Sequence, residues 1–147
     1  MELFSIIVQA LTAMAIVFAA WQLLFHSRQM HRDFELVYVQ RYWELMDRRS
    51  ASLALEGLPR RRDRTVIRSY LQLCEDEIDL RRLGRVSDNT WRFWATSIVE
   101  QASTEPWAAE IAKLGSSQYP LLRKLIESDV AYDPLEHSWV WRKLHGL

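Results

Sequence analysis

Four acidic side chains lie within five positions of this chain, so they are the first place to look for chemistry. Residues 71–87 read LQLCEDEIDLRRLGRVS, and the acids Glu75, Asp76, Glu77 and Asp79 precede Arg81 and Arg82. Clustered carboxylates bind metal ions or transfer protons in many proteins. The same pattern is also typical of the charged face of a helix, here one that would end at Gly84.

A helix over residues 63–83 divides these acids between two faces. At about 100° per residue, Glu75 and Asp79 fall on a polar stripe, and Asp76 lies beside it. Glu77 falls among apolar residues instead. A buried carboxylate is costly unless it is paired, so we expect an ion pair between Glu77 and Arg81, with Tyr70 as a second partner. Glu77→Ala is then expected to destabilise the fold more than Glu75→Ala.

The sequence contains no other pattern of a catalytic or metal site. It has no Glu-x-x-His, no His-Glu-x-x-His, no cysteine pair, no Gly-x-Ser-x-Gly and no glycine-rich phosphate loop. Cys74 falls at an apolar helical position, which favours a structural role over a nucleophilic one. The segment DNTWRFW after Gly84 is too aromatic and too weakly basic for a DNA-reading helix. We therefore expect no enzyme activity, no cofactor, no metal and no nucleic-acid partner.

Residues 3–25 form an uncharged, mostly apolar run. At about 1.5 Å per residue it spans about 34 Å, which is enough to cross a hydrocarbon core of about 30 Å. We predict a transmembrane helix here. A cleaved signal peptide is the alternative, but the preceding Met-Glu carries no basic residue and the run is longer than a usual signal core.

Basic residues follow this run and do not precede it. His26, Arg28, His31 and Arg32 lie just beyond it, whereas Glu2 lies before it. The positive-inside rule therefore predicts a single-pass protein of the cytoplasmic (inner) membrane, with its N-terminus outside and residues 26–147 in the cytoplasm. The lone cysteine agrees with a reducing compartment.

One side of the predicted span carries small and polar residues: Ser5, Gln9, Thr12, Ala15 and Ala19. Small residues allow two membrane helices to approach closely, and a glutamine in lipid seeks a hydrogen-bond partner. This side is a candidate self-association face. The alternative is that its alanines are ordinary components of a membrane helix.

Helical spacing and capping residues recur through the rest of the chain and predict an all-α fold, a transmembrane helix followed by a cytosolic multi-helix bundle. The expected helices cover about 28–50, 63–83, 88–102, 105–114, 119–129 and 134–145. Gly84 and Ser87 are expected caps, and Asp133 is expected to cap the last helix. The helix over 28–50 is apolar on two sides, so we expect it to pack between neighbours. Most of the seven tryptophans are expected in the core.

A second basic group lies in the loop before residue 63, and it consists of Arg60, Arg61, Arg62 and Arg64, with Arg68 a turn later. Close to a bilayer, such a group would attract anionic lipid headgroups. The alternative is a solvated loop that begins a helix. Arginines are unfavourable at a helix N-terminus, so we expect an anionic counterpart in either case.

Several of these segments together resemble a group of uncharacterised bacterial single-pass membrane proteins. The resemblance covers residues 10–100 and rests on the exit from the span, on RYWELMD and on YLQLCEDEIDLRRLGRVSDNTWRFW. It implies a helical cytosolic domain of unknown function and implies no activity.

The sequence therefore favours a membrane-anchored helical domain that docks or regulates a partner protein. The expected partners are the lipid bilayer and either further copies of the chain or another membrane or cytosolic protein. Two alternatives stay open: a ligand-binding protein or enzyme with a pocket at Glu77 and Arg81, or an anionic-lipid sensor that uses Arg60–Arg64.

Overall fold

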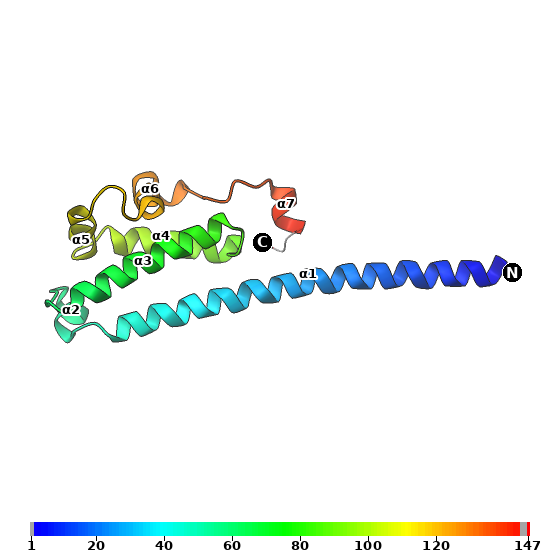
Figure 1. Ribbon diagram of the computed structural model, residues 1–147, viewed down its shortest axis with the longest axis horizontal. Coiled ribbons are helices and arrows are strands. Elements are labelled where there is room, and N and C mark those ends of the chain that lie inside the picture. The colour runs from blue at the N-terminus through cyan, green and yellow to red at the C-terminus, as the bar shows by residue number, and fades with distance from the viewer. Residues whose placement is uncertain (1, 145–146) are drawn as a thin grey trace.

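The protein is all-helical, as the sequence predicts. The computed structural model describes residues 2–144 and 147, apart from the side chains of residues 3, 24, 27, 28, 30, 31, 130 and 144. Its elements are α1 (Glu2–Asp47), α2 (Ala51–Glu56), α3 (Asp63–Arg82), α4 (Asp88–Ala102), α5 (Trp107–Lys113), α6 (Pro120–Ser128), the 3₁₀ helix η1 (Asp129–Ala131) and α7 (Trp139–Leu144). The described residues form no β-strand. Helices α2 to α7 gather beside the C-terminal half of α1 (Figure 1).

Helix α1 is continuous from the apolar N-terminal segment into the helical domain. It has 46 residues, which corresponds to about 69 Å. The stretch Phe4–Leu23 is long and apolar enough to cross a membrane, and none of it is buried in the chain, although a signal sequence near the N-terminus has the same properties. No glycine or proline interrupts α1, which explains why the predicted span over 3–25 and the predicted helix over 28–50 form one continuous helix.

The helix predicted over 28–50 ends early, at Asp47, because Ser50 begins a separate short helix. The Ser50 hydroxyl accepts a hydrogen bond from the Leu53 amide and so caps α2. The buried carboxylate of Asp63 accepts from the Ser50 amide and hydroxyl, at 2.8 and 2.6 Å, and from the Arg60 amide at 2.7 Å. Burial alone would raise the pKa of Asp63, but these hydrogen bonds outweigh it and hold the pKa below its ordinary value.

The turn between α3 and α4 has the caps that the sequence predicts. Gly84 adopts φ +67, which an L residue rarely adopts, and its amide donates to the Arg81 carbonyl. The Ser87 hydroxyl accepts from the Thr90 amide at the start of α4. The Ser87 amide in turn donates to the Glu35 carboxylate at 2.9 Å, and this bond fastens α1 to the beginning of α4.

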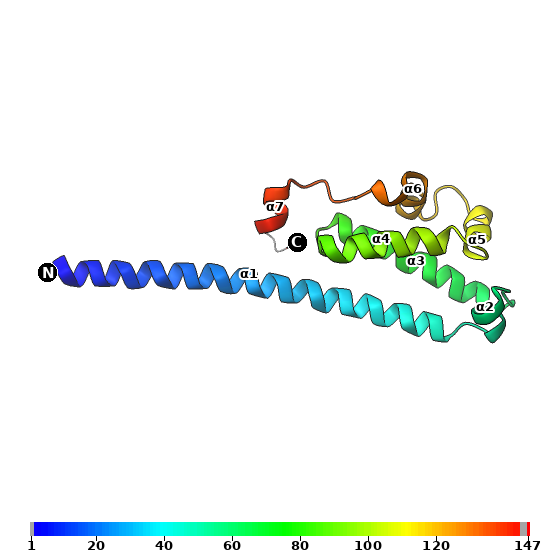
Figure 2. The same cartoon turned by 180° about the vertical axis from the view of Figure 1, so that it is seen from behind.

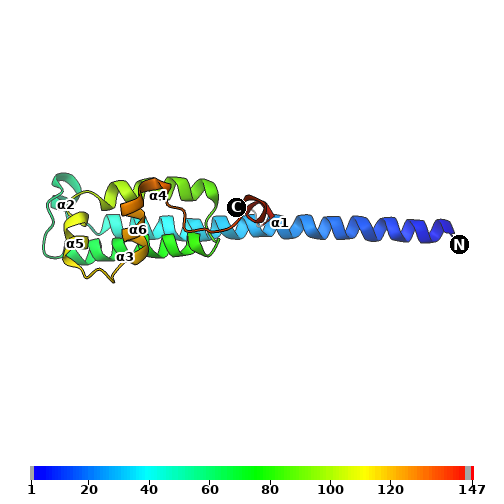
Figure 3. The ribbon, with the colours of Figure 1, turned by 90° about the horizontal axis from the view of Figure 1, so that it is seen from above.

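The core lies where α3 and α4 meet α1 on one side and α5 and α6 on the other (Figures 1 and 3). Its buried members are Met46, Leu53, Ile67, Tyr70, Leu71, Cys74, Ile78, Val86, Trp91, Trp94, Ala95, Ile98, Ala102, Trp107, Ile111, Leu122 and Leu125. The expectation that most tryptophans are buried is wrong. Trp91, Trp94 and Trp107 are buried, whereas Trp21, Trp43 and Trp139 are exposed.

The predicted helix over 134–145 is wrong in its first half. Residues 133–138 are not helical, α7 begins only at Trp139, and His145 lies outside the described residues. Asp133 does not cap a helix, because its carboxylate binds an arginine of α3 and the Leu135 amide. Helix α5 likewise begins at Trp107, two residues later than expected.

Candidate functional site

The four clustered acids of α3 point to different neighbours and do not form one site. Asp76 accepts from Gln72, and Asp79 pairs with Arg82 on the exposed surface. Among the described residues no three His, Cys, Asp or Glu side chains are arranged to hold a metal ion. The charged stretch is therefore a set of separate contacts.

Glu75 is not part of a solvated stripe, which corrects the sequence expectation. Its two carboxylate oxygens accept from the amides of Leu121 and Leu122, at 3.0 and 2.8 Å. These amides lie at the start of α6 directly after Pro120, where the helix itself offers them no acceptor. Glu75 thus caps α6 from a neighbouring helix and sets the position of α6 on α3.

Glu77 is buried, with 7% of its surface exposed. Burial, together with the neighbouring Asp76, raises the pKa of Glu77 to about 8. Burial and Glu77 also raise the pKa of the Cys74 thiol, and the pKa of Tyr38 on α1 is raised by burial and by the acids of α3. No cation among the described residues pairs with Glu77. The carboxyl group therefore favours its neutral form in the folded domain.

The expected pair between Glu77 and Arg81 does not form, because Arg81 binds other acids. Its guanidinium donates to both oxygens of Asp133, at 2.9 and 2.5 Å, to Asp88 at 2.7 Å, and to the Val86 carbonyl at 2.9 Å. The buried position of Arg81 would lower its pKa, but these hydrogen bonds raise it above its ordinary value. Tyr70, the second expected partner, lies in the core and its pKa is raised by burial and by Cys74.

Arg142 of α7 completes this network. It donates to Asp133 and Asp88, at 3.1 and 3.4 Å, and to the carbonyls of Leu135 and His137. The four charged side chains connect α3, the start of α4, the irregular segment 133–138 and α7. Because these arginines and aspartates hydrogen-bond to one another, the arrangement favours a structural role that holds α7 beside the α3–α4 turn.

The second basic group divides in two. Arg68 pairs with the buried Glu110 at 2.7 Å, so its counterpart is an acid of α5. The group's other members, Arg60, Arg61, Arg62 and Arg64, are exposed beside the loop between α2 and α3. That loop lies at the end of the domain farthest from the N-terminal segment (Figure 1).

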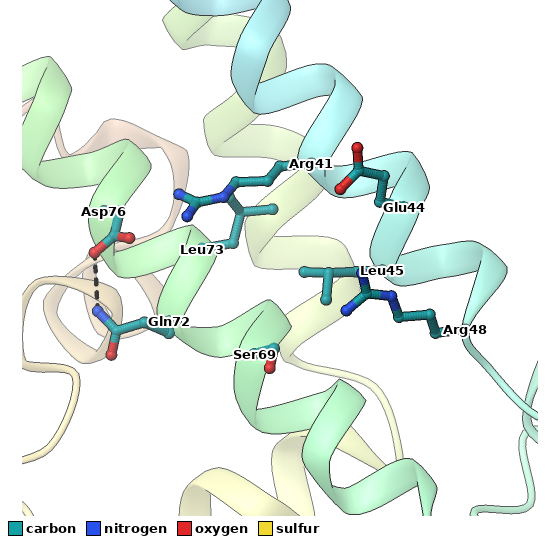
Figure 4. A pocket seen from close by; sticks show the side chains of 8 residues that line it. All are labelled: Arg41, Glu44, Leu45, Arg48, Ser69, Gln72, Leu73 and Asp76. Atoms are coloured by element: carbon teal, nitrogen blue, oxygen red, sulfur yellow. Dashed lines mark hydrogen bonds between the residues drawn. The ribbon is translucent and has the colours of Figure 1, made fainter.

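A groove of about 350 Å³ lies between α1 and α3, as Figure 4 shows. Arg41, Glu44 and Arg48 of α1 and Gln72 and Asp76 of α3 are among its lining residues. Its acidic and basic side chains occur in equal number, and Gln40 and Gln72 donate to its two carboxylates. Glu77 and Arg81 do not line this groove.

The candidate self-association face in the apolar segment is exposed along α1 at Ser5, Gln9, Thr12, Ala15 and Ala19. The Thr12 hydroxyl donates to the Val8 carbonyl at 2.8 Å, so this polar group is satisfied within its own helix. The Gln9 amide is the largest polar group of this face, and it is the group that could hydrogen-bond to a partner helix.

Beyond the apolar segment, each of the two predicted apolar sides of α1 is covered only in part, and Phe34 and Val37 of the first side remain 41% and 56% exposed. Tyr38, Tyr42 and Leu45 pack against the core, and Met46 is buried in it. Leu36, Val39 and Trp43 are 70%, 42% and 59% exposed. Their i, i+3, i+7 spacing places them along one line of the helix, and we name them the α1 stripe.

Comparison with protein-family models, with curated proteins and with solved structures finds no match to this chain.

Proposed function

We propose that this protein is a membrane-anchored, non-enzymatic helical module that docks or regulates a partner protein at the cytoplasmic face of the inner membrane. The observation that carries the proposal is the α1 stripe. Leu36, Val39 and Trp43 leave a continuous apolar line exposed on the same helix that contains the candidate membrane span. Large exposed side chains in a line are typical of protein-binding surfaces.

The spacing of the stripe suits a partner helix. Residues at i, i+3 and i+7 are the positions that one helix buries against another in a two-helix seam. A partner could be a second copy, whose α1 the membrane would hold parallel to this one, or a helix of another membrane or cytosolic protein. Trp43 supplies the large aromatic anchor that binding surfaces commonly contain.

The alternatives have weaker support. Arg81 is fully engaged by Asp88, Asp133 and the Val86 carbonyl, which leaves little of it to bind a ligand. The exposed arginines of the second basic group follow α2, beyond the C-terminal end of α1. Asp47, at that end, lies about 33 Å past Phe25 along the helix, which is far beyond the reach of the lipid headgroups at the end of the span.

Photocrosslinking tests the docking proposal on the full chain in its native membrane. Trp43→p-benzoylphenylalanine places a crosslinker in the stripe, and the same substitution at the exposed Glu100 of α4 is the control. We expect a discrete protein adduct from position 43 that is lost when Leu36→Ser and Val39→Ser are added. Adducts of equal yield from both positions, or only lipid adducts from position 43, would contradict the proposal.

Mass spectrometry of the membrane-extracted protein tests the anchor separately. An anchored chain retains the peptides of residues 3–25, whereas a chain that lacks them has had a signal peptide removed. A cysteine-labelling reagent that does not cross the membrane then tests the orientation. It should label Val140→Cys only after the cells are opened.

A further inference from the structure

The part of the domain nearest to the candidate span is α7. Along α1, α7 lies closer to the N-terminus than the α3–α4 turn does, in all three views (Figures 1, 2 and 3). Trp139 and Lys143 of α7 line a hollow of about 620 Å³ together with Arg32 and Glu35 of α1 and Arg92 of α4.

This hollow would lie at the level of the lipid headgroups if α1 spans the membrane. Arg32 is seven residues beyond Phe25, which corresponds to about 10 Å along the helix. The headgroup region extends about 5–8 Å beyond the hydrocarbon core, and long basic side chains extend several Å further toward it. The hollow is therefore within reach of lipid phosphates.

Among the described residues, none of the three basic side chains of the hollow forms an ion pair with its acids, Glu35 and Asp88. Glu35 accepts from the Ser87 amide, and Asp88 accepts from Arg81 and Arg142. Among the described residues, Arg92 donates to the Asp88 carbonyl and the Asn89 side chain, which are both neutral. No carboxylate among the described residues pairs with Arg32, Arg92 or Lys143. Three cations from three separate helices thus line one hollow, and none of them is held in an ion pair.

The exposed apolar side chains of α7 also suit a position at the lipid headgroups. Trp139 and Val140 are 70% and 60% exposed, and the Lys143 ammonium lies 5.8 Å from the centre of the Trp139 ring. Tryptophan beside basic residues is the composition of segments that lie at a membrane–water interface.

We infer that the hollow formed by Arg32, Arg92 and Lys143 binds the phosphate of an anionic phospholipid headgroup, with Trp139 and Val140 of α7 resting in the interface. The inference rests on the membrane anchoring proposed above and adds a lipid contact to it. Each basic side chain near an anionic surface changes the ratio of docked to undocked domain by about fivefold. Removing all three should change that ratio by roughly a hundredfold.

The test places a fluorophore at Val140→Cys in the full chain, in nanodiscs that carry a headgroup nitroxide quencher. The native Cys74 is fully buried, so it is shielded from the label. We expect strong quenching in discs that contain phosphatidylglycerol. The quenching should fall to the level of pure phosphatidylcholine discs when Arg32, Arg92 and Lys143 are replaced by Gln. The matched control replaces three exposed arginines at the far end of the domain, Arg60, Arg61 and Arg64, by Gln.

Each outcome separates the inference from the proposal on which it rests. If the chain remains in the discs and position 140 is not quenched, the lipid contact is wrong and the anchor stands. If the chain does not remain in the discs, both are wrong. Equal loss of quenching from the distal control would show only a general charge effect and overturn the site. Millimolar inorganic phosphate is also added to the labelled chain in phosphatidylcholine discs. If it changes the fluorescence of the label at position 140 without quenching by the headgroup nitroxide, the hollow binds a soluble anion and the lipid contact is wrong.

Discussion

Replacing Glu77 by Gln should stabilise the domain at neutral pH, although the substitution removes a charged residue from the centre of a charged stretch of sequence. Glu77 is buried between α3 and α1, and its pKa is about 8 against an ordinary 4.5. The folded domain therefore binds the proton more tightly than the unfolded chain does. Glutamine has nearly the same shape and is neutral at every pH.

The sign and size of the effect follow from this pKa. A carboxyl group whose pKa is raised on folding contributes stability that is complete below about pH 4.5 and is lost as the pH rises to about 8. The loss is about 1.4 kcal/mol for each pH unit between these limits. At neutral pH the wild-type domain should have lost about 3 kcal/mol that Glu77→Gln retains. Tyr38 and Cys74, which face Glu77, are neutral across this range because their pKa values are also raised.

Urea unfolding of the full chain in detergent, followed by tryptophan fluorescence, measures the effect. The free energy of unfolding is determined at several pH values from about 5 to 8 for the wild type, for Glu77→Gln and for the control Glu100→Gln, which changes an exposed glutamate of α4. The wild-type and Glu77→Gln curves should diverge steadily as the pH rises. Parallel curves would refute the reasoning, because they would show that Glu77 titrates alike in the folded and unfolded chains.

The other expected effects concern caps and turns. Glu75→Ala removes the cap of α6 and should lower the free energy of unfolding in urea by about 1–2 kcal/mol, whereas Asp79→Ala, at an exposed pair, should change it by less than about 0.5 kcal/mol. Asp63→Ala removes the acceptor of the buried Ser50 amide and hydroxyl and of the Arg60 amide, and it should lower that free energy by about 2–4 kcal/mol. Since the pKa of Asp63 is lowered on folding, the wild type should lose this advantage as the pH falls through that pKa. Gly84→Ala and Gly57→Ala both place an alanine at a φ of +67, which is strained. A Cβ at position 84 would also lie 3.2 Å from a tryptophan ring of α7, so Gly84→Ala should lower the melting temperature more than Gly57→Ala does. Equal shifts of the melting temperature would contradict this contact.

Features set by neighbouring residues could be predicted from the sequence. The glycine cap at 84, the serine cap at 87 and the apolar periodicity of α3 and α4 all act within a few positions, and each is present in the structure. The burial of Glu77 also follows from its place on the helical wheel. Such signals need no knowledge of which distant segment packs against them.

Features set by distant residues could not be predicted in this way. The pattern at Asp133 and Pro134 is typical of a helix start, but Arg81, 52 positions away, binds the Asp133 carboxylate. Two charge-assisted bonds to a buried guanidinium outweigh one capping bond, so residues 133–138 stay irregular. The role of Glu75 could not be predicted for the same reason, because the amides that it caps belong to α6, 46 and 47 positions away.

Charge that is clustered in the sequence and charge that is clustered in space are also different here. The arginines at 60, 61, 62 and 64 form the densest basic run of the chain, yet they follow α2, at the far end of the domain. Arg32, Arg92 and Lys143 are spread over more than a hundred positions and line one hollow. Because α1 is one unbroken helix, each residue along it has a definite height above the candidate span, at about 1.5 Å per residue. That height, and not the density of basic residues in the sequence, decides which cations could reach a lipid phosphate, and it favours the scattered three over the contiguous four.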